Sequence, residues 1–140
     1  MTSTIVPCLR YADAPKMIDW LCETFGFARH LVVEDGNGGI AHAQLTLGPG
    51  MIMLGSKRAD AFGDLQATPE TLGGTTQSPY VIVDDADRLY DKAKAAGAEI
   101  VMEIADQDYG GRLFSCRDPE GHLWNIGSYD PWAEAPGATD

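Results

Sequence analysis

The twelve residues "DPEGHLWNIGSY", at positions 118–129, decide how this chain folds. "DPEG" places proline at the second position of a four-residue turn, where its fixed φ angle is favoured. The preceding "RLFSCR" and the following "HLWNIGS" are rich in strand-forming residues, so the region predicts two strands joined by a tight turn. The same stretch contains Glu120, His122 and Asn125, and it therefore raises the question of a metal site.

Part of this stretch, and several features that precede it, repeat at an offset of 72 positions. Pro7 aligns with Pro79 and Asp13 aligns with Asp85, while "LGS" at 54–56 aligns with "IGS" at 126–128. Each identity is weak alone, but the order of predicted elements repeats as well. A repeat of this kind indicates two copies of one supersecondary unit that share a core.

Each half predicts a strand, a helix and three further strands. Asp13 caps the first helix and Gly26 ends it, because aspartate accepts from free N–H groups and glycine adopts the left-handed conformation beyond the last turn. Asp84 or Asp85 caps the second helix, which stops at Gly97. The predicted strands are 4–11, 28–34, 41–47 and 51–55 in the first half, and 79–83, 99–104, 112–117 and 122–128 in the second.

The chain is therefore expected to have an α+β fold with two tandem βαβββ modules, whose curved mixed sheets surround a cavity. We expect one domain over 1–134, made of module 4–56, a surface linker 57–77 and module 78–130, followed by a loose tail 135–140. One helix covers only one face of a four-stranded sheet, and so small a module buries little surface alone. We therefore expect the two curved sheets to form a concave ligand site that a second chain completes, in a homodimer with or without exchanged elements.

Composition limits the possible partners. Twenty-one acidic and ten basic residues give a formal charge of −11, which disfavours nucleic acid and anionic membranes as partners. This charge either serves solubility alone or favours a cationic small molecule. The three cysteines are odd in number and widely spaced, and the amino end lacks the pattern of a secretory signal. We therefore expect no disulfide framework and a cytoplasmic protein.

The paired modules, the opening "YADAPKMIDWLCETFGF" and the ending "RDPEGHLWNI" resemble the vicinal oxygen chelate superfamily over residues 4–130. This group includes glyoxalase I, extradiol dioxygenases, fosfomycin-modifying enzymes and bleomycin resistance proteins. The resemblance implies metal ligands on the first and fourth strands of each module, at Val6, Met53, Ser78 and Asn125. None of these side chains is a usual ligand for a catalytic divalent ion, so we predict no metal and no other cofactor.

Other residues are candidates for the wall of a ligand cavity. Cys8 lies two positions beyond Val6 on the first strand, and His42 and Gln44 alternate with small or apolar residues. Tyr80 should point with Ser78. The segment that leads into the seventh strand adds three further candidates, which are Tyr109, Arg112 and Phe114. Arg112 either binds an anionic ligand group or pairs with one of the many carboxylates. We expect His122 to pack beside the turn and to bond backbone.

Three functions remain open from the sequence. The first is a metal-free small-molecule-binding protein, similar to the drug-sequestering antibiotic resistance members of the family, with no assigned catalytic residue. The second is a metal-dependent glyoxalase-like lyase or isomerase, or a dioxygenase, with an unusual ligand set such as His42, Gln44 and Glu103. The third is a metal-free catalyst in which His42 or Cys8 acts as base or nucleophile.

Overall fold

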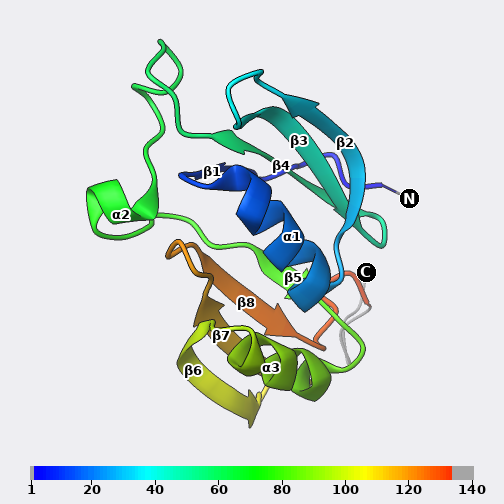
Figure 1. The fold of residues 1–140 in the computed structure, drawn as a ribbon. Helices are drawn as coiled ribbons and strands as arrows, with labels where there is room; N and C mark the ends of the chain where they lie inside the picture. The colour runs from blue at the N-terminus through cyan, green and yellow to red at the C-terminus, as the bar shows by residue number, and fades with distance from the viewer. Residues whose placement is uncertain (1, 134–140) are drawn as a thin grey trace.

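The computed structural model describes residues 2–133 and has two four-stranded mixed sheets (Figure 1). The first sheet has the strand order β1-β4-β3-β2 and the second has β5-β8-β7-β6. The first module contains β1 (Cys8–Tyr11), α1 (Ala14–Phe25), β2 (Ala28–Glu34), β3 (Ile40–Leu47) and β4 (Gly50–Ser56). The second contains β5 (Tyr80–Ile82), α3 (Ala86–Ala95), β6 (Glu99–Asp106), β7 (Arg112–Arg117) and β8 (Leu123–Gly127). The expected α+β fold of two βαβββ modules is confirmed.

The first strand of each module is shorter than expected because each begins directly after a proline. Pro7 precedes β1 and Pro79 precedes β5, and proline has no N–H group to donate to a neighbouring strand. Both prolines still accept with their carbonyl oxygens, from the N–H groups of Met53 and Asn125 respectively, each at 2.9 Å. The repeated proline therefore sets the same strand start twice.

The segment between the modules has some structure of its own. It includes the short helix α2 (Pro69–Leu72), and Thr68 and Pro69 are both buried. Gly121, in the turn before β8, lies close to Pro69, so α2 packs beside that turn. The expected loose tail at 135–140 lies outside the described residues. Within residues 2–133, no helix is both long enough and apolar enough to cross a membrane.

Helix α1 begins and ends where its capping residues predict. The side chain of Asp13 accepts from the N–H of Lys16, and Gly26, at a φ of 87°, donates its N–H to the carbonyl of Cys22. The apolar stripe of the helix is buried against the first sheet and comprises Ala14, Met17, Ile18, Leu21 and Phe25. Helix α3 repeats this pattern with Asp85 as its cap.

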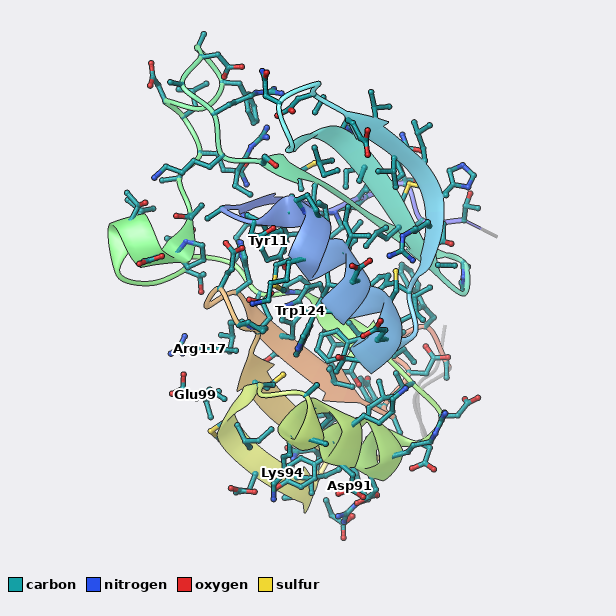
Figure 2. All side chains as sticks on the ribbon, viewed as in Figure 1. Tyr11, Asp91, Lys94, Glu99, Arg117 and Trp124 are labelled. Atoms are coloured by element: carbon teal, nitrogen blue, oxygen red, sulfur yellow. The ribbon has the colours of Figure 1, made fainter. Side chains whose placement is uncertain are left out.

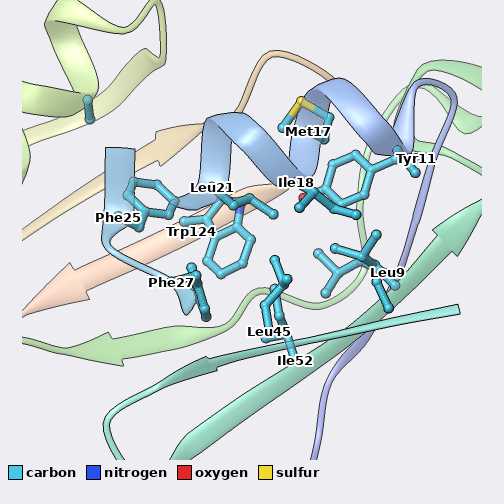
Figure 3. Close-up of a cluster of buried hydrophobic side chains, with 14 of the residues drawn as sticks. Leu9, Tyr11, Met17, Ile18, Leu21, Phe25, Phe27, Leu45, Ile52 and Trp124 are labelled. Atoms are coloured by element: carbon cyan, nitrogen blue, oxygen red, sulfur yellow. The ribbon is translucent and has the colours of Figure 1, made fainter. Parts of the chain in front are cut away.

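One hydrophobic core joins the modules. Helices α1 and α3 are neighbours, and the indole N–H of Trp20 donates to the carbonyl of Ala96 at 2.9 Å. Trp124 of β8 is fully buried and packs edge to face against Phe25 and Phe27 of the first module (Figure 3). Because a large aromatic side chain from one module fills a space in the other, truncating it should cost about 3–5 kcal/mol.

The turn at 118–121 fastens the modules together through Asp118, whose side chain is buried. One of its oxygens accepts from the Tyr11 hydroxyl at 2.6 Å and from the Trp124 indole at 3.0 Å. The other accepts from the backbone N–H groups of Glu120 and His122 at 3.0 and 3.1 Å. Figure 2 shows Tyr11 and Trp124 near the middle of the molecule, where the modules meet.

Two further side chains of this turn reach across to the first module. The carboxylate of Glu120 accepts from the backbone N–H groups of Ala12 and Asp13, at 2.6 and 2.8 Å. A ring nitrogen of His122 lies 2.7 Å from the carbonyl of Arg10 and donates to it. The expected structural role of His122 is therefore confirmed. The stretch that decides the fold does so by bonding to the start of α1 and to β1.

Candidate functional site

Each sheet has one face covered by its helix and one that the helix leaves open, which we call the open face. Strand register assigns residues to these faces. Cys8 pairs with Met53, and Met53 pairs with Gln44, while Leu9 and Leu54 lie on the covered side. The open face of the first sheet therefore carries Cys8, Arg10, His42, Gln44 and Met53.

The polar candidates on this open face lie side by side. Cys8 is exposed, whereas His42, Gln44 and Met53 are half-buried. A ring nitrogen of His42 lies 3.1 Å from the side-chain nitrogen of Gln44. The thiol of Cys8 contacts the carbonyl of Val6 at 3.7 Å, and Val6 itself precedes the strand. The sequence expectation that these residues share a surface therefore agrees with the register.

A cavity of about 130 Å³ opens on this face. It lies between the strands and the segment that follows β4, and its lining includes Cys8, Arg10, His42, Met53, Arg58 and Phe62. Arg10 was not among the expected site residues, although it lies two positions after Cys8 and therefore has the same orientation. This alternation was the signal that could have identified it.

On the second sheet, Asn125 is the centre of a polar group. Its side-chain oxygen accepts from the hydroxyl of Ser115 at 2.7 Å, and its side-chain nitrogen donates to the hydroxyl of Ser78 at 2.8 Å. The carboxamide is thus held on both sides. Ser115 pairs with Asn125 across β7 and β8 and is buried, although it was not among the expected site residues.

The four expected metal positions do not fit a divalent cation. Valine offers no lone pair, and the thioether of Met53 is a soft ligand that suits cuprous copper better. Asn125 and Ser78 bond to each other, and the Asn125 oxygen already accepts from Ser115. Within the part of the chain that the structure describes, no cluster of three or more histidine, cysteine, aspartate or glutamate side chains is placed to hold a metal.

The alternative ligand set is not assembled either. His42 and Gln44 are adjacent on the first sheet, but Glu103 lies on β6 in the second module. The carboxylate of Glu103 accepts from the hydroxyl of Tyr90, which belongs to α3. Glu103 therefore faces the helix side of its sheet, away from the open face.

Two expected pocket residues, Arg112 and Phe114, lie on the wrong face. Phe114 is fully buried in the core and packs edge to face on Tyr90 of α3. Arg112 donates to Asp87 of α3 and to Asp106, at 2.9–3.1 Å, so its alternative role as a partner of carboxylates is the one observed. These hydrogen bonds raise the pKa of the Arg112 guanidinium. Ser115, which follows Phe114, pairs with Asn125 and therefore lies on the open face. Because side chains alternate along a strand, Arg112 and Phe114 point to the opposite, covered face.

Tyr80 and Tyr109 lie near the open face of the second sheet. The hydroxyl of Tyr80 donates to the carbonyl of Tyr129 at 2.6 Å, and the ring of Tyr109 packs edge to face on that of Tyr129. Burial raises the pKa of the Tyr80 hydroxyl. Tyr80 also lines a largely apolar groove of about 660 Å³, which the N-terminal segment, β4, β5 and Trp124 border as well.

One chain does not bring the two groups of candidates together. The covered faces of both sheets contribute to the same core, so the open faces lie on the far sides of the sheets from that core. All residues that line the 130 Å³ cavity belong to the first module or to the segment after it, and the 660 Å³ groove includes neither Met53 nor Asn125. The expected cavity between two open faces is therefore not formed within the described residues of a single chain.

Known proteins share both the sequence pattern and the fold. Residues 4–126 match the family model described as "Glyoxalase/Bleomycin resistance protein/Dioxygenase superfamily". The uncharacterized protein Mb0911c of Mycobacterium bovis is 32% identical over 121 residues, which cover 86% of this chain and 80% of that protein. The crystal structure of TioX from Micromonospora sp. ML1 is 34% identical, with a TM-score of 0.70, and the match covers 89% of this chain and 97% of TioX. The fosfomycin resistance protein FosX from Mesorhizobium loti, at 13% identity and a TM-score of 0.62, covers 94% of this chain and 95% of its own and shares the fold alone.

Proposed function

Because the chain belongs to the glyoxalase/bleomycin resistance protein/dioxygenase superfamily, we propose that it binds a small organic molecule without a metal ion. The observation that carries this proposal is that the Asn125 side chain is already hydrogen-bonded within the protein. Its carboxamide bonds to Ser115 and Ser78, and the partner position on the first sheet is the thioether of Met53. Where open faces of two copies meet, these groups would form a neutral, partly apolar wall that suits an organic ligand better than a cation.

The binding unit in this proposal is a homodimer. Large apolar side chains are exposed on both open faces: Leu31 and Val33 on the first sheet, and Tyr80, Ile82 and Met102 on the second. A sheet face that no helix covers, and that exposes several large apolar side chains, favours an interaction site there. If the open face of one copy lies against that of another, Met53 with its neighbours Cys8, His42 and Gln44 would share one cavity with Asn125 and its partners Ser78 and Ser115. A single chain does not bring these two sets of residues together.

The biological role follows the family's description, which includes bleomycin resistance proteins. We extend the proposal to sequestration of a drug-like compound in the cytoplasm. The thiols of Cys8, Cys22 and Cys116 are free, which agrees with a reducing compartment. The net charge of −11 favours approach of a compound with a positive group, and this part of the proposal rests on the long-range field alone.

Elemental analysis and ligand screening test the binding proposal. Protein purified without a histidine tag should contain no stoichiometric zinc, nickel, manganese or iron. A thermal-shift screen of drug-like compounds should yield ligands that, at about 100 times their dissociation constant, stabilise the protein by about 2.7 kcal/mol. One bound transition-metal ion per chain, together with turnover of a hemithioacetal, would replace the proposal with the enzyme alternative.

Introducing a negative charge on the open face tests the proposed dimer interface independently of ligand binding. Met102 is 64% exposed on the open face of the second sheet, and Leu72 is 70% exposed on α2, which belongs to neither sheet. Sedimentation should give a dimer for the wild type and for Leu72→Glu, and a monomer for Met102→Glu. A dimer that persists in Met102→Glu but dissociates in Leu72→Glu would place the interface elsewhere.

A further inference from the structure

Arg10 is a charged side chain buried on the open face of the first sheet. It is 8% exposed, and one terminal nitrogen of its guanidinium donates to the carbonyl of Ser56 at 3.2 Å. Its Nε atom is buried and, within residues 2–133, meets no hydrogen-bond acceptor. An unsatisfied buried donor on a charged group is destabilising, so such a group needs an explanation.

The sequence provides space for this guanidinium. Gly55 pairs with Arg10 in the parallel ladder of β1 and β4. A Cβ atom at position 55 would lie 2.7 Å from the terminal Arg10 nitrogen, which is closer than real contacts allow. Glycine therefore lets the guanidinium lie across the sheet. The ring of Phe62, which is 46% exposed, covers it with its centroid 5.0 Å from the guanidinium carbon.

A second positive charge lines the same cavity. Arg58 borders the 130 Å³ space together with Arg10. Burial lowers the pKa of the Arg10 guanidinium, and the charge of Arg58 lowers it further. Arg58 pairs with Asp60 at 2.6 Å, but among residues 2–133 no aspartate or glutamate lines the cavity itself. Two cations and one carboxylate leave a net positive cluster in a protein whose formal charge is −11.

We propose that Arg10 and Arg58 form a subsite for an anionic group, a carboxylate or a phosphate-like oxyanion, on the bound molecule. The Nε side of a guanidinium is one of the edges that bind such oxygens in a bidentate manner, and in Arg10 the Nε donor is the one without a partner. The half-exposed Phe62 ring lines the same cavity and stacks on this guanidinium. A cavity of about 130 Å³ is roughly ten times the space that one water needs, which is enough for one oxyanion and the atoms next to it.

The inference rests on the proposed function, because the subsite lies on the same open face as Cys8, His42 and Met53. The subsite adds that the ligand carries a negative charge. A ligand that satisfies both the overall field and this subsite carries a positive group and an anionic group. The subsite requires neither the whole ligand nor the second copy, since all its residues belong to one module and the segment that follows it. Inorganic phosphate and acetate can therefore probe it directly.

The test follows the Nε–H signal of Arg10 by nuclear magnetic resonance of the full chain. Phosphate or acetate, added at constant ionic strength against chloride, should shift this signal saturably. Arg58→Gln should weaken binding of the same anion by about two- to fivefold, because it removes one charge from the cavity. Arg88→Gln, an equal change of charge on the exposed surface of α3, should change it less than twofold. Arg10→Lys keeps the charge, removes the Nε donor and identifies the signal.

Two results would overturn the subsite. One is an Arg10 signal that does not respond to either anion. The other is equal weakening by Arg58→Gln and Arg88→Gln, which would reduce the effect to general charge screening. Because Arg58→Gln alters an exposed side chain, it tests the subsite even if Arg10→Lys fails to fold. Failure here leaves the ligand screen and the dimer measurement untouched, so the two proposals can fail independently.

Discussion

Replacing Tyr11 by phenylalanine should destabilise the protein far more than the same change at Tyr80. The Tyr11 hydroxyl donates to the buried carboxylate of Asp118 at 2.6 Å, across the junction of the modules. Hydrogen bonds to charged groups contribute about 1.5–3 kcal/mol, and we expect Tyr11→Phe to lose an amount in this range. Tyr80 donates to a neutral carbonyl and is 37% exposed, so Tyr80→Phe should cost less than about 1 kcal/mol.

Urea unfolding followed by tryptophan fluorescence measures both variants, at one fixed protein concentration because association also stabilises the folded state. An unchanged dependence on urea with a lower midpoint indicates a true loss of stability. Equal destabilisation by Tyr11→Phe and Tyr80→Phe would refute the reasoning that the Asp118 carboxylate fastens the two modules.

The pH dependence of the stability difference between wild type and Tyr11→Phe is a second test of the same prediction. Burial raises the pKa of the Tyr11 hydroxyl well above its ordinary value, and the neighbouring Asp118 carboxylate raises it further. The contribution of Tyr11 is therefore complete below the unfolded-state pKa of about 10 and declines as the pH rises towards the folded-state pKa. Above about pH 10 the advantage of wild type over Tyr11→Phe should shrink by up to about 1.4 kcal/mol per pH unit. A constant difference between pH 9 and pH 11 would contradict this assignment.

Three further predictions concern thiols, packing and metal binding. Burial raises the pKa of the Cys116 thiol to about 12, so an aromatic disulfide reagent at pH 8 should label the exposed Cys8 first and Cys116 only on unfolding, and rapid native labelling of Cys116 would disprove its burial. Gly55→Ala should cost about 1–3 kcal/mol in urea unfolding, because its Cβ atom would lie 2.7 Å from the buried Arg10 guanidinium and 3.1 Å from the backbone carbonyl oxygen of Ala41, whereas Gly74→Ala, which meets nothing within 4 Å, should be neutral. Asn125→Glu should not bind zinc or nickel in a calorimetric titration, since the other three positions still lack suitable ligands, and tight binding would count against the alignment of those positions.

The fold was predictable because its boundaries are encoded locally. Asp13 and Gly26 begin and end α1 through bonds to residues three or four positions away, and such bonds depend on nearby sequence alone. The repeated prolines at positions 7 and 79 act in the same local way. The packing of α2 beside the 118–121 turn was not predictable, because it joins segments about fifty residues apart that no periodicity links.

The site was predicted less well, and the errors follow the pairing of strands. His42 and Gln44 were placed correctly because alternation within one strand fixes which residues share a face. Arg112 and Phe114 were misplaced because their face depends on β7 pairing with β8. Counting back from the turn shows that Ser115 opposes Asn125. Such counting was possible from sequence once the tight turn was recognised.

Arg10 shows where sequence reasoning ends. An arginine on a predicted strand is usually exposed, and nothing next to it in the chain indicates burial. Its burial depends on Gly55, which lies 45 positions later and becomes its neighbour only through the parallel pairing of β1 with β4. The register of a parallel pair is not fixed by a short turn, so a space that one residue leaves for another across it is visible only in the structure.

The 118–122 stretch also explains why this chain looks like a metal protein without having the matching ligands. Glu120 and His122 are residue types that bind cations, but both bond to backbone groups of the first module. Removing either would leave unpaired groups at the start of α1 or on β1, so architecture constrains them whether or not a metal is bound. The positions open to functional change are those on the open faces, where Met53 and Asn125 stand. A search for the function of this chain should therefore begin with organic ligands for those faces, and the buried guanidinium beside them indicates that the first compounds to try carry an oxyanion.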